Sequence, residues 1–449
     1  MNAAASSRET ARAVRSALPE GGLFAGQSWR ISPEPFPLDP AIVKELESLG
    51  RVFLQFYRAA NLLYRKSAEG KQPDWVARWL DLGKPRELIE LQRSQSLKNE
   101  IPRVIRPDLL LTDDGIRVTE LDSVPGGIGL TAWLNATYSK ISPPDVAGRL
   151  IGGADAMIRG FAGIFGSAPR VHIVVSEESA SYRPEMDWIV ARLNETSPGR
   201  YAVRPPDFLE FAPGDAVYRF FELFDLPQVP SAAALFAKAA AREIRLTPPP
   251  KPVFEEKMLF ALLWNRNLQG FWRQELGESF FQRMLQITPR TWLLDPAPLP
   301  PQGAIPELNL TDWSQLKLLS QKERDLILKV SGYSELAWGA RGVHLGSDLP
   351  HDAWSRAVDD AIAGFERHPS VLQRYHKPAL VDAAWFDFDR EELTPMKGRA
   401  RLCPYYFVSG DGDAARAEWC GLLATICPAD KKIIHGMTDA ILAPGMKGV

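Results

Sequence analysis

The stretch Arg106–Leu130, RPDLLLTDDGIRVTELDSVPGGIGL, contains the pattern on which the fold prediction rests. Two runs of strand-forming residues flank the triplet Asp113-Asp114-Gly115, and this glycine can supply the positive φ that a tight hairpin loop requires. If residues 112 and 116 close the ladder, the turn fixes the register of the two strands. The stretch therefore predicts a β-hairpin followed by a proline- and glycine-rich turn.

This register predicts which polar side chains face one another. Asp108 lies opposite Glu120, and Arg106 lies opposite Asp122. Side chains alternate along a strand, so these four groups share one face of the hairpin and the other face carries the apolar residues Leu109, Leu111 and Leu121. Carboxylates directly opposite each other repel, and a divalent ion such as Mg²⁺ or Mn²⁺ bridging to phosphate would relieve the repulsion.

The alternative interpretation is a solvated hairpin face with no ligand. The turn Pro125–Gly129 favours a site, because small residues let the backbone approach a ligand closely. Arg106 would then hold a phosphoryl oxygen beside the metal ion.

The spacing of these residues resembles that of circularly permuted ATP-grasp ligases of the glutathionylspermidine synthase type. The shared pattern is Arg-x-Asp, a Glu twelve positions after that Asp, and a metal ligand two positions further, and Arg106, Asp108 and Glu120 match it. Asp122 departs from it, because the family usually has Asn there. The resemblance implies that Asp108, Glu120 and Asp122 hold Mg²⁺ and that Arg106 is the catalytic group that binds the phosphoryl or acylphosphate oxygens.

A second informative stretch, residues 327–346, reads ILKVSGYSELAWGARGVHLG. It predicts a strand with Lys329, a glycine-containing loop and a return strand. ATP-grasp proteins use such an arrangement, and the resemblance implies that Lys329 binds phosphate while the loop, with Gly339, Arg341 and Gly342, covers the triphosphate. A plain hairpin is the alternative.

Two further segments resemble nucleotide-binding parts of the family. Lys257 lies near the start of a predicted helix over 254–264, where the family has a lysine that reaches phosphates; a solvated lysine is the alternative. The predicted strand 371–375, VLQRY, looks like the strand that lines the adenine pocket, so Gln373 and Tyr375 are expected to contact the base.

Length and composition exclude several classes of protein. A chain of 449 residues predicts two or three lobes, and 45% hydrophobic with 24% charged residues is typical of globular proteins. A net charge of -2 gives no sign of a nucleic-acid or membrane partner. The N-terminus lacks a signal-peptide pattern, and the three cysteines lack zinc-type spacing, so reduced thiols and a cytoplasmic location are expected.

The predicted fold class is α/β: a circularly permuted ATP-grasp fold with a small doubly wound domain and an N-terminal helical region. Residues 1 to about 30 are expected to be a frayed arm, and one helix is expected over about 144–165. The sequence predicts four regions: the arm and helices over 1–100, the metal-binding hairpin and its helix over 101–165, the small α/β domain over 166–250, and the nucleotide-binding lobes over 251–449.

The resemblance implies an ATP- and Mg²⁺-dependent carboxylate–amine ligase. A small-molecule carboxylate would attack the γ-phosphate of ATP, and an amine would displace phosphate from the resulting acylphosphate. The sequence leaves two alternatives open: a degenerate ATP-grasp protein that binds nucleotide or metabolite without ligation, and a phosphotransferase on the same fold. It does not identify the acid, the amine or the oligomeric state.

Overall fold

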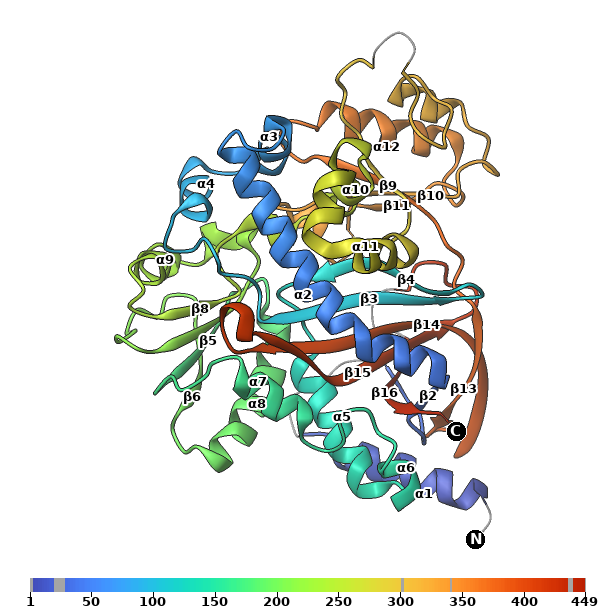
Figure 1. The fold of residues 1–449 in the computed structure, drawn as a ribbon. Helices are drawn as coiled ribbons and strands as arrows, with labels where there is room; N and C mark the ends of the chain where they lie inside the picture. Colours follow the sequence, from blue (N-terminus) through green and yellow to red (C-terminus); the bar gives the residue numbers. More distant parts are fainter. Residues whose placement is uncertain (1–2, 20–28, 300–302, 340, 435–438, 449) are drawn as a thin grey trace. The chain divides into compact units, whose positions relative to one another are not determined.

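The computed structural model describes residues 3–19, 29–299, 303–339, 341–434 and 439–448. It shows a mixed α/β architecture with three sheets in the described ranges (Figure 1). The chain divides into two compact units. Unit 1 comprises Met1–Leu54, Glu100–Pro249 and Lys377–Val449, and unit 2 comprises Gln55–Asn99 and Pro250–His376.

The predicted hairpin consists of β3 (Val104–Thr112) and β4 (Gly115–Asp122), which pair antiparallel. Arg106 pairs with Asp122, and Asp108 pairs with Glu120, so both predicted cross-strand pairs are confirmed. The polar face of the hairpin therefore follows from the sequence pattern.

The predicted closing pair of this hairpin is wrong. Thr112 pairs with Gly115, whose φ of 98° only glycine adopts readily, and the register shifts by one residue after Asp108. Thr119 is the additional residue of this β-bulge, and its hydroxyl donates to the carbonyl of Asp108 at 3.1 Å. Because paired residues share a face, the bulge places three apolar residues together on the buried face: Leu109, Ile116 and Val118.

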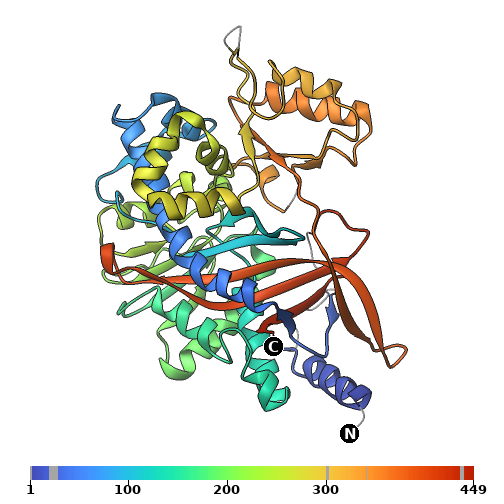
Figure 2. The ribbon, with the colours of Figure 1, turned by 45° about the vertical axis from the view of Figure 1, so that its right-hand side comes forward.

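The hairpin forms one edge of the large sheet of unit 1. The strand order is β1 (Arg30–Ile31), β16 (Ile441–Lys447), β15 (Arg416–Pro428), β14 (Glu392–Ser409), β3 and β4. β14 pairs antiparallel with β15 and, on its other side, with β3 of the hairpin. In addition, β13 (Leu380–Asp387) pairs with the first part of β14 as a long ribbon, visible in Figure 2, and β2 (Phe36–Leu38) pairs with β16.

Two helix predictions for unit 1 are wrong. Residues 144–165 form two short helices, α6 (Pro144–Ala147) and α7 (Ala156–Gly163), because Gly152 and Gly153 between them have positive φ. The expected frayed arm contains α1 (Ala3–Ser16), whose Ala11 and Val14 are fully buried.

The helix α5 (Ile128–Ile141) was not predicted. It begins inside the proline- and glycine-rich turn, and residues 128–135 are all buried. A helix that is buried on every side shows no alternation of polar and apolar faces, so the periodicity that identifies surface helices is missing.

A four-stranded parallel sheet completes unit 1. Its order is β6 (Tyr201–Arg204), β5 (Val171–Val175), β7 (Ala216–Phe220) and β8 (Arg245–Thr247). The helix α8 (Arg183–Thr196) connects β5 to β6, and α9 (Ala232–Ala240) precedes β8. β5 and β7 are fully buried, as the apolar run of β5 predicts.

Unit 2 has an antiparallel sheet in the order β11 (Val343–Leu345), β10 (Leu326–Val330), β12 (Ser370–Arg374) and β9 (Thr291–Leu293). Its helices are α3 (Asp74–Asp81), α4 (Arg86–Arg93), α10 (Met258–Trp264), α11 (Gln269–Ile287) and α12 (His351–Ala363).

The helix α2 (Pro40–Ala68) contributes residues to both units. In unit 2 its Phe56 stacks on Trp272 with ring centroids 5.5 Å apart, so this aromatic side chain belongs to the core. Within the described residues, no helix combines the length and apolar character that crossing a membrane requires.

One ion pair of unit 2 is completely buried. The Lys84 ammonium lies 2.6 Å from the Glu256 carboxylate, and both side chains are 0% exposed. Glu256 also accepts a hydrogen bond from Ser331, the residue that follows β10. This pair therefore fixes the end of β10 to the segment before α10.

Removing one partner of this pair should destabilise unit 2. Lys84→Met leaves the Glu256 charge buried without its counter-ion, so we expect the free energy of unfolding to fall by about 3–5 kcal/mol in urea titrations. The double variant Lys84→Met/Glu256→Leu should recover at least half of this loss. The exposed pair of Arg86 and Glu90 offers the control, since Arg86→Met should leave the midpoint unchanged. A midpoint unaltered in Lys84→Met would contradict the assigned role.

Candidate functional site

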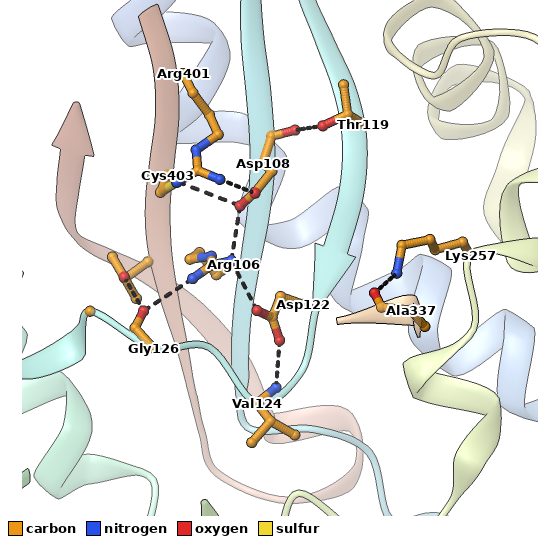
Figure 3. A network of polar contacts seen from close by, with 12 residues as sticks. Arg106, Asp108, Thr119, Asp122, Val124, Gly126, Lys257, Ala337, Arg401 and Cys403 are labelled. Atoms are coloured by element: carbon orange, nitrogen blue, oxygen red, sulfur yellow. Dashed lines mark hydrogen bonds and ion pairs between the residues drawn. The ribbon is translucent and has the colours of Figure 1, made fainter. Parts of the chain in front are cut away.

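Arg106 is the centre of the polar face of the hairpin (Figure 3). Its Nη2 lies 3.1 Å from Asp108 Oδ1 and 2.9 Å from Asp122 Oδ2, and its Nη1 donates to the Gly126 carbonyl at 3.0 Å. Burial by itself would lower the pKa of Arg106, but the two carboxylates outweigh it and hold that pKa well above its usual value. Arg106 therefore remains charged and joins the hairpin to the following turn.

A second guanidinium reaches this cluster from the neighbouring strand. Arg401 on β14 donates to Asp108 Oδ2 at 3.0 Å, and the thiol of Cys403 lies 3.5 Å from Asp108 Oδ1. Arg401 therefore pairs with an acid of the hairpin. Burial, followed by the charge of Asp108, raises the pKa of Cys403 to about 12, so this thiol stays protonated at neutral pH.

Asp122 stands at the position where the ligases that the hairpin pattern resembles usually have asparagine. Burial raises the pKa of Asp122 to about 6, although Arg106 lowers it and the Val124 backbone N–H donates to its Oδ1 at 2.9 Å. Glu120 and Asp108 raise this pKa further. Asp122 thus ionises only near neutral pH.

The carboxylates of Asp108 and Asp122 form ion pairs with two arginines, Arg106 and Arg401. In the part of the chain that the structure describes, no three His, Cys, Asp or Glu side chains come together as they would around a metal ion. Arg106 occupies the space between Asp108 and Asp122. The residues as arranged do not fit a resident divalent ion, so the predicted metal site of Asp108, Glu120 and Asp122 stays a prediction.

A buried carboxylate holds the glycine-rich turn that follows the hairpin. Glu185 on α8 accepts the N–H of Gly127 at 2.7 Å through Oε1 and that of Leu130 at 3.0 Å through Oε2. The residue is 3% exposed, and burial raises its pKa to about 7 against the lowering effect of these backbone donors. Glu185 therefore anchors the start of α5 and titrates near neutral pH.

Two tyrosines hold the same turn from other elements. The Tyr405 hydroxyl on β14 donates to the Gly126 carbonyl at 2.7 Å, the same oxygen that Arg106 contacts. A Cβ on Gly126 would lie 2.2 Å from the ring of Tyr182, so only glycine fits. Sequence reasoning assigned no role to Glu185, Tyr182 or Tyr405, because only the tertiary fold brings them to the turn.

In unit 2, the predicted phosphate lysine lies within a buried network. Lys329 on β10 is 7% exposed, and its Nζ donates to Gln373 Oε1 at 3.0 Å. Gln373 on β12 in turn donates to the Thr291 hydroxyl at 3.2 Å. Gln373 is 2% exposed, and both its amide oxygen and its amide nitrogen have hydrogen-bond partners in the protein. Gln373 therefore supports Lys329 in this structure and does not present its amide to a ligand.

The structure places Lys257 beside the glycine-containing loop. Its Nζ donates to the Ala337 carbonyl of that loop at 2.9 Å (Figure 3), and its backbone N–H donates to Ser331 O at 2.9 Å. Lys257 directly precedes α10 and does not lie inside the expected longer helix over 254–264. Since Ser331 is two residues after Lys329, the two predicted phosphate lysines flank the start of one loop.

The glycine-containing loop joins β10 to β11 as predicted. Gly342 closes it by donating its N–H to Leu336 O at 2.8 Å, and Gly339 has a positive φ of 66°. The Arg341 guanidinium lies 5.1 Å from the ring centroid of Trp338, and residue 340 lies outside the described residues. Tyr375 follows β12 and donates its backbone N–H to Asp325 O at 3.0 Å.

Comparison with known proteins identifies the fold. No protein-family model and no curated protein sequence matches the chain. A glutathione synthetase-like effector from Globodera pallida in its apo form is similar at a TM-score of 0.57 and 12% identity, over 99% of this chain and 97% of that one. A candidate gamma-glutamylcysteine synthetase from Methylobacillus flagellatus has a TM-score of 0.41 at 11% identity, over 87% of this chain and 88% of that one. This TM-score is too low to establish a shared fold. At these identities the likeness concerns the fold alone.

The raised pKa of Glu185 predicts how stability depends on pH. Between its ordinary value of 4.5 and about 7, the folded state holds a proton that the unfolded state releases, so stability is present at pH 4.5 and is lost as the pH rises through 7. We expect this group to contribute a loss on the order of 3 kcal/mol in urea titrations between pH 4.5 and 8. Glu185→Gln should remove that part of the pH dependence.

Glu195→Gln is the control for this measurement, because Glu195 lies on the same helix with 55% of its side chain exposed. It should retain the pH profile of the wild type. If Glu185→Gln also retained that profile, the assigned titration of Glu185 would be wrong.

Proposed function

We propose that the protein is an ATP-dependent carboxylate–amine ligase of the permuted ATP-grasp type, similar to glutathionylspermidine synthase. The observation that carries this proposal is the grouping of Lys257, Lys329 and the glycine-containing loop in unit 2. Three separate elements supply these groups, and their chemistry suits a polyphosphate. The fold shared with a glutathione synthetase-like protein supports the same class of reaction.

The unit 2 residues would bind the nucleotide. Each lysine donates to a neutral protein oxygen, Lys257 to Ala337 O and Lys329 to Gln373 Oε1. A phosphate oxygen is a stronger acceptor than either, because a hydrogen bond between two charged groups is about twice as strong as one between neutral groups. The lysines would exchange these partners for phosphate, and the loop would exclude water from the reacting groups.

In unit 1, two arginines are suited to an oxyanion. Arg106 and Arg401 each have a buried Nε–H without a hydrogen-bond partner, which is unusual for a guanidinium and which an oxyanion would satisfy. The proposed reaction forms a bond between a substrate carboxylate oxygen and the γ-phosphorus while the bond to ADP breaks. The amine nitrogen then bonds to the acyl carbon, phosphate leaves, and the nitrogen releases a proton.

Divalent metal enters this scheme as part of the substrate MgATP. The carboxylates Asp108 and Asp122 are engaged by Arg106, so no step is assigned to a metal ion held by the protein. The permuted order is part of the proposal: the hairpin precedes the strand of Lys329 in the chain.

A nucleotide-binding protein without ligase activity is the second candidate. The pairing of Asp108 with both Arg106 and Arg401 favours it, because a carboxylate neutralised twice is a poor metal ligand. Under this alternative ATP binds, but no amine accelerates phosphate release.

Substitution of either lysine should weaken ATP binding. We expect Lys329→Met and Lys257→Met each to raise the dissociation constant of MgATP at least tenfold, about 1.4 kcal/mol, in isothermal titration calorimetry. Lys317→Met is the matched control, because Lys317 lies in unit 2 and pairs with Asp359 on the surface. Absence of MgATP binding by the folded wild type would exclude both candidate functions.

Substitution of Arg106 should separate catalysis from binding. Arg106→Lys retains a positive charge between Asp108 and Asp122 but loses the planar guanidinium, so amine-dependent phosphate release should fall at least 100-fold, about 2.7 kcal/mol. The dissociation constant of MgATP should change less than threefold. Arg117→Lys is the control, since Arg117 lies on the same hairpin and donates to the backbone carbonyls of Asp114 and Ile116. Unaltered phosphate release in Arg106→Lys would remove Arg106 from the mechanism.

A further inference from the structure

A fully buried histidine in the parallel sheet of unit 1 has no role in the proposed ligase reaction. His172 lies on β5 and is 1% exposed. Histidine is the side chain whose charge ordinarily changes close to physiological pH. The groups that contact its two ring nitrogens therefore decide whether His172 only fills space or also senses pH.

One of these contacts fixes the protonation state of the ring. Arg204, the last residue of β6, donates its Nε–H to His172 Nδ1 at 3.1 Å. A guanidinium group offers only donors, so Nδ1 is the acceptor and carries no proton. Nε2 then bears the hydrogen of the neutral ring and donates to Asp215 Oδ2 at 3.1 Å. His172 is consequently neutral in this arrangement.

The acid on the other side of the ring is held in place by several donors. Asp215 is 1% exposed and accepts the backbone N–H of Ala212 at 2.8 Å. Both of its carboxylate oxygens also accept from the Arg170 guanidinium, at 3.1 Å each. Burial raises the pKa of Asp215, but these donors and His172 outweigh it and hold that pKa below its usual value. Asp215 is therefore a charged, fixed partner for Nε2.

The segment that connects β6 to β7, residues 205–214, covers this ring. β6 and β7 both run parallel to β5, which lies between them. The β6–β7 connection has to return from the carboxyl end of β6 to the amino end of β7, so it crosses β5. On the way, the rings of Phe208 and Phe211 pack against His172 with centroids 5.1 Å and 5.6 Å from it.

Arg204 also contacts the β6–β7 connection. Its guanidinium carbon lies 4.3 Å from the ring centroid of Phe208, and Phe208 packs edge to face on Phe211 at 5.1 Å. One side chain thus joins the acceptor nitrogen of His172 to the aromatic pair that covers it. The position of the connection depends on this hydrogen bond and on these ring contacts.

Protonation of His172 would break the arrangement. An imidazolium has N–H groups at both nitrogens, so Nδ1–H would meet the Arg204 Nε–H, donor against donor and cation against cation. Burial lowers the pKa of His172 below its ordinary value of 6.5, Asp215 raises it, and the charges of Arg204 and Arg170 lower it again. In acid, Arg204 would have to leave Nδ1 and give up its position over Phe208.

The other charged groups around the ring have their own partners or lie in solvent. Asp207 and Glu210 of the β6–β7 connection are exposed. Lys238 on α9 pairs with Glu243 at 3.2 Å, and Arg219 on β7 donates to backbone carbonyls. Exposed charges are screened by salt and water, so Arg204, Asp215 and Arg170 are the charges that decide the state of His172.

We propose that His172 is a pH-dependent latch: the neutral ring accepts from Arg204 and holds residues 205–214 across β5, and the protonated ring releases them. This inference is independent of the proposed ligase function. Because the pKa of His172 is lowered in the closed form, the opened segment binds the proton at a higher pH than the closed one. Closure is therefore complete above pH 6.5 and weakens as the pH falls through the lowered pKa.

Hydrogen–deuterium exchange of the full-length protein, corrected for the intrinsic effect of pH on exchange, measures this opening. Between pH 7.5 and 5.0 we expect the protection of residues 205–214 to fall about fivefold or more, because each pH unit between 6.5 and the lowered pKa favours the open form by up to about tenfold. Residues 128–141 are the internal reference. Glu185 holds the start of α5 and stabilises it when protonated, so protection there should not fall.

Two variants assign the effect to the latch. His172→Gln keeps an acceptor and a donor but does not titrate, so the loss of protection in acid should disappear. Arg204→Met keeps an apolar contact with Phe208 but has no N–H donor, so residues 205–214 should be less protected already at pH 7.5. In nitrogen NMR of the imidazole groups, the signal that His172→Gln removes should have its proton on Nε2 at pH 7.5.

His351→Gln is the matched control, because His351 lies in unit 2 at the start of α12 with 65% of its side chain exposed. It should lose protection of residues 205–214 in acid as the wild type does. Three results would each overturn the inference: equal protection of residues 205–214 at the two pH values, a loss that persists in His172→Gln, or a proton on Nδ1 at pH 7.5. If His172→Gln does not fold, wild-type protection and Arg204→Met still decide the question.

Discussion

The structure of the candidate site in unit 1 depends on one buried guanidinium. Arg106 pairs with Asp108 on its own strand and Asp122 on the partner strand, and it also donates to Gly126 in the next turn. Loss of this group would remove the ion pair of Asp122 and one of the two ion pairs of Asp108, in a site where all three side chains are at most 22% exposed. Arg106 consequently joins the hairpin to the glycine-rich turn, while Glu185 holds the same turn to the start of α5.

The sequence predicted local features of the site better than its tertiary partners. Alternation placed Arg106 and Asp122 opposite each other, and the pattern around Lys329 predicted the strand and its loop, because both signals act over a few residues. The pairing of Arg401 with Asp108 joins residues 293 positions apart, which no local periodicity reports. The bulge at Thr119 was not predicted, for a related reason. The turn sequence permits two registers that differ by one residue, and side-chain packing across the strands decides between them.

The predicted phosphate lysines of unit 2 differ from Arg106 of unit 1 in the partners that their side chains contact. Lys257 and Lys329 donate to the oxygens of Ala337 and Gln373, so each ammonium group has an uncharged hydrogen-bond partner. Such a partner can be exchanged for an anion at small loss. Arg106, in contrast, has ion pairs with two carboxylates, and its position is fixed before any ligand binds.

The balance of charge on the hairpin face gives a reason for the aspartate at position 122. The face carries three carboxylates, Asp108, Glu120 and Asp122, against the two guanidinium groups of Arg106 and Arg401, a formal charge of -3 + 2 = -1. With asparagine at 122, as in the ligases that the hairpin pattern resembles, the face would be neutral. A bare phosphate is repelled by a net negative face, whereas a phosphate that arrives with its own cation is not. Under the proposed function, Asp122 would therefore favour an anion that arrives with its own cation over a bare anion, and because its pKa of about 6 lies just below neutral, this preference should strengthen as the pH rises through 6.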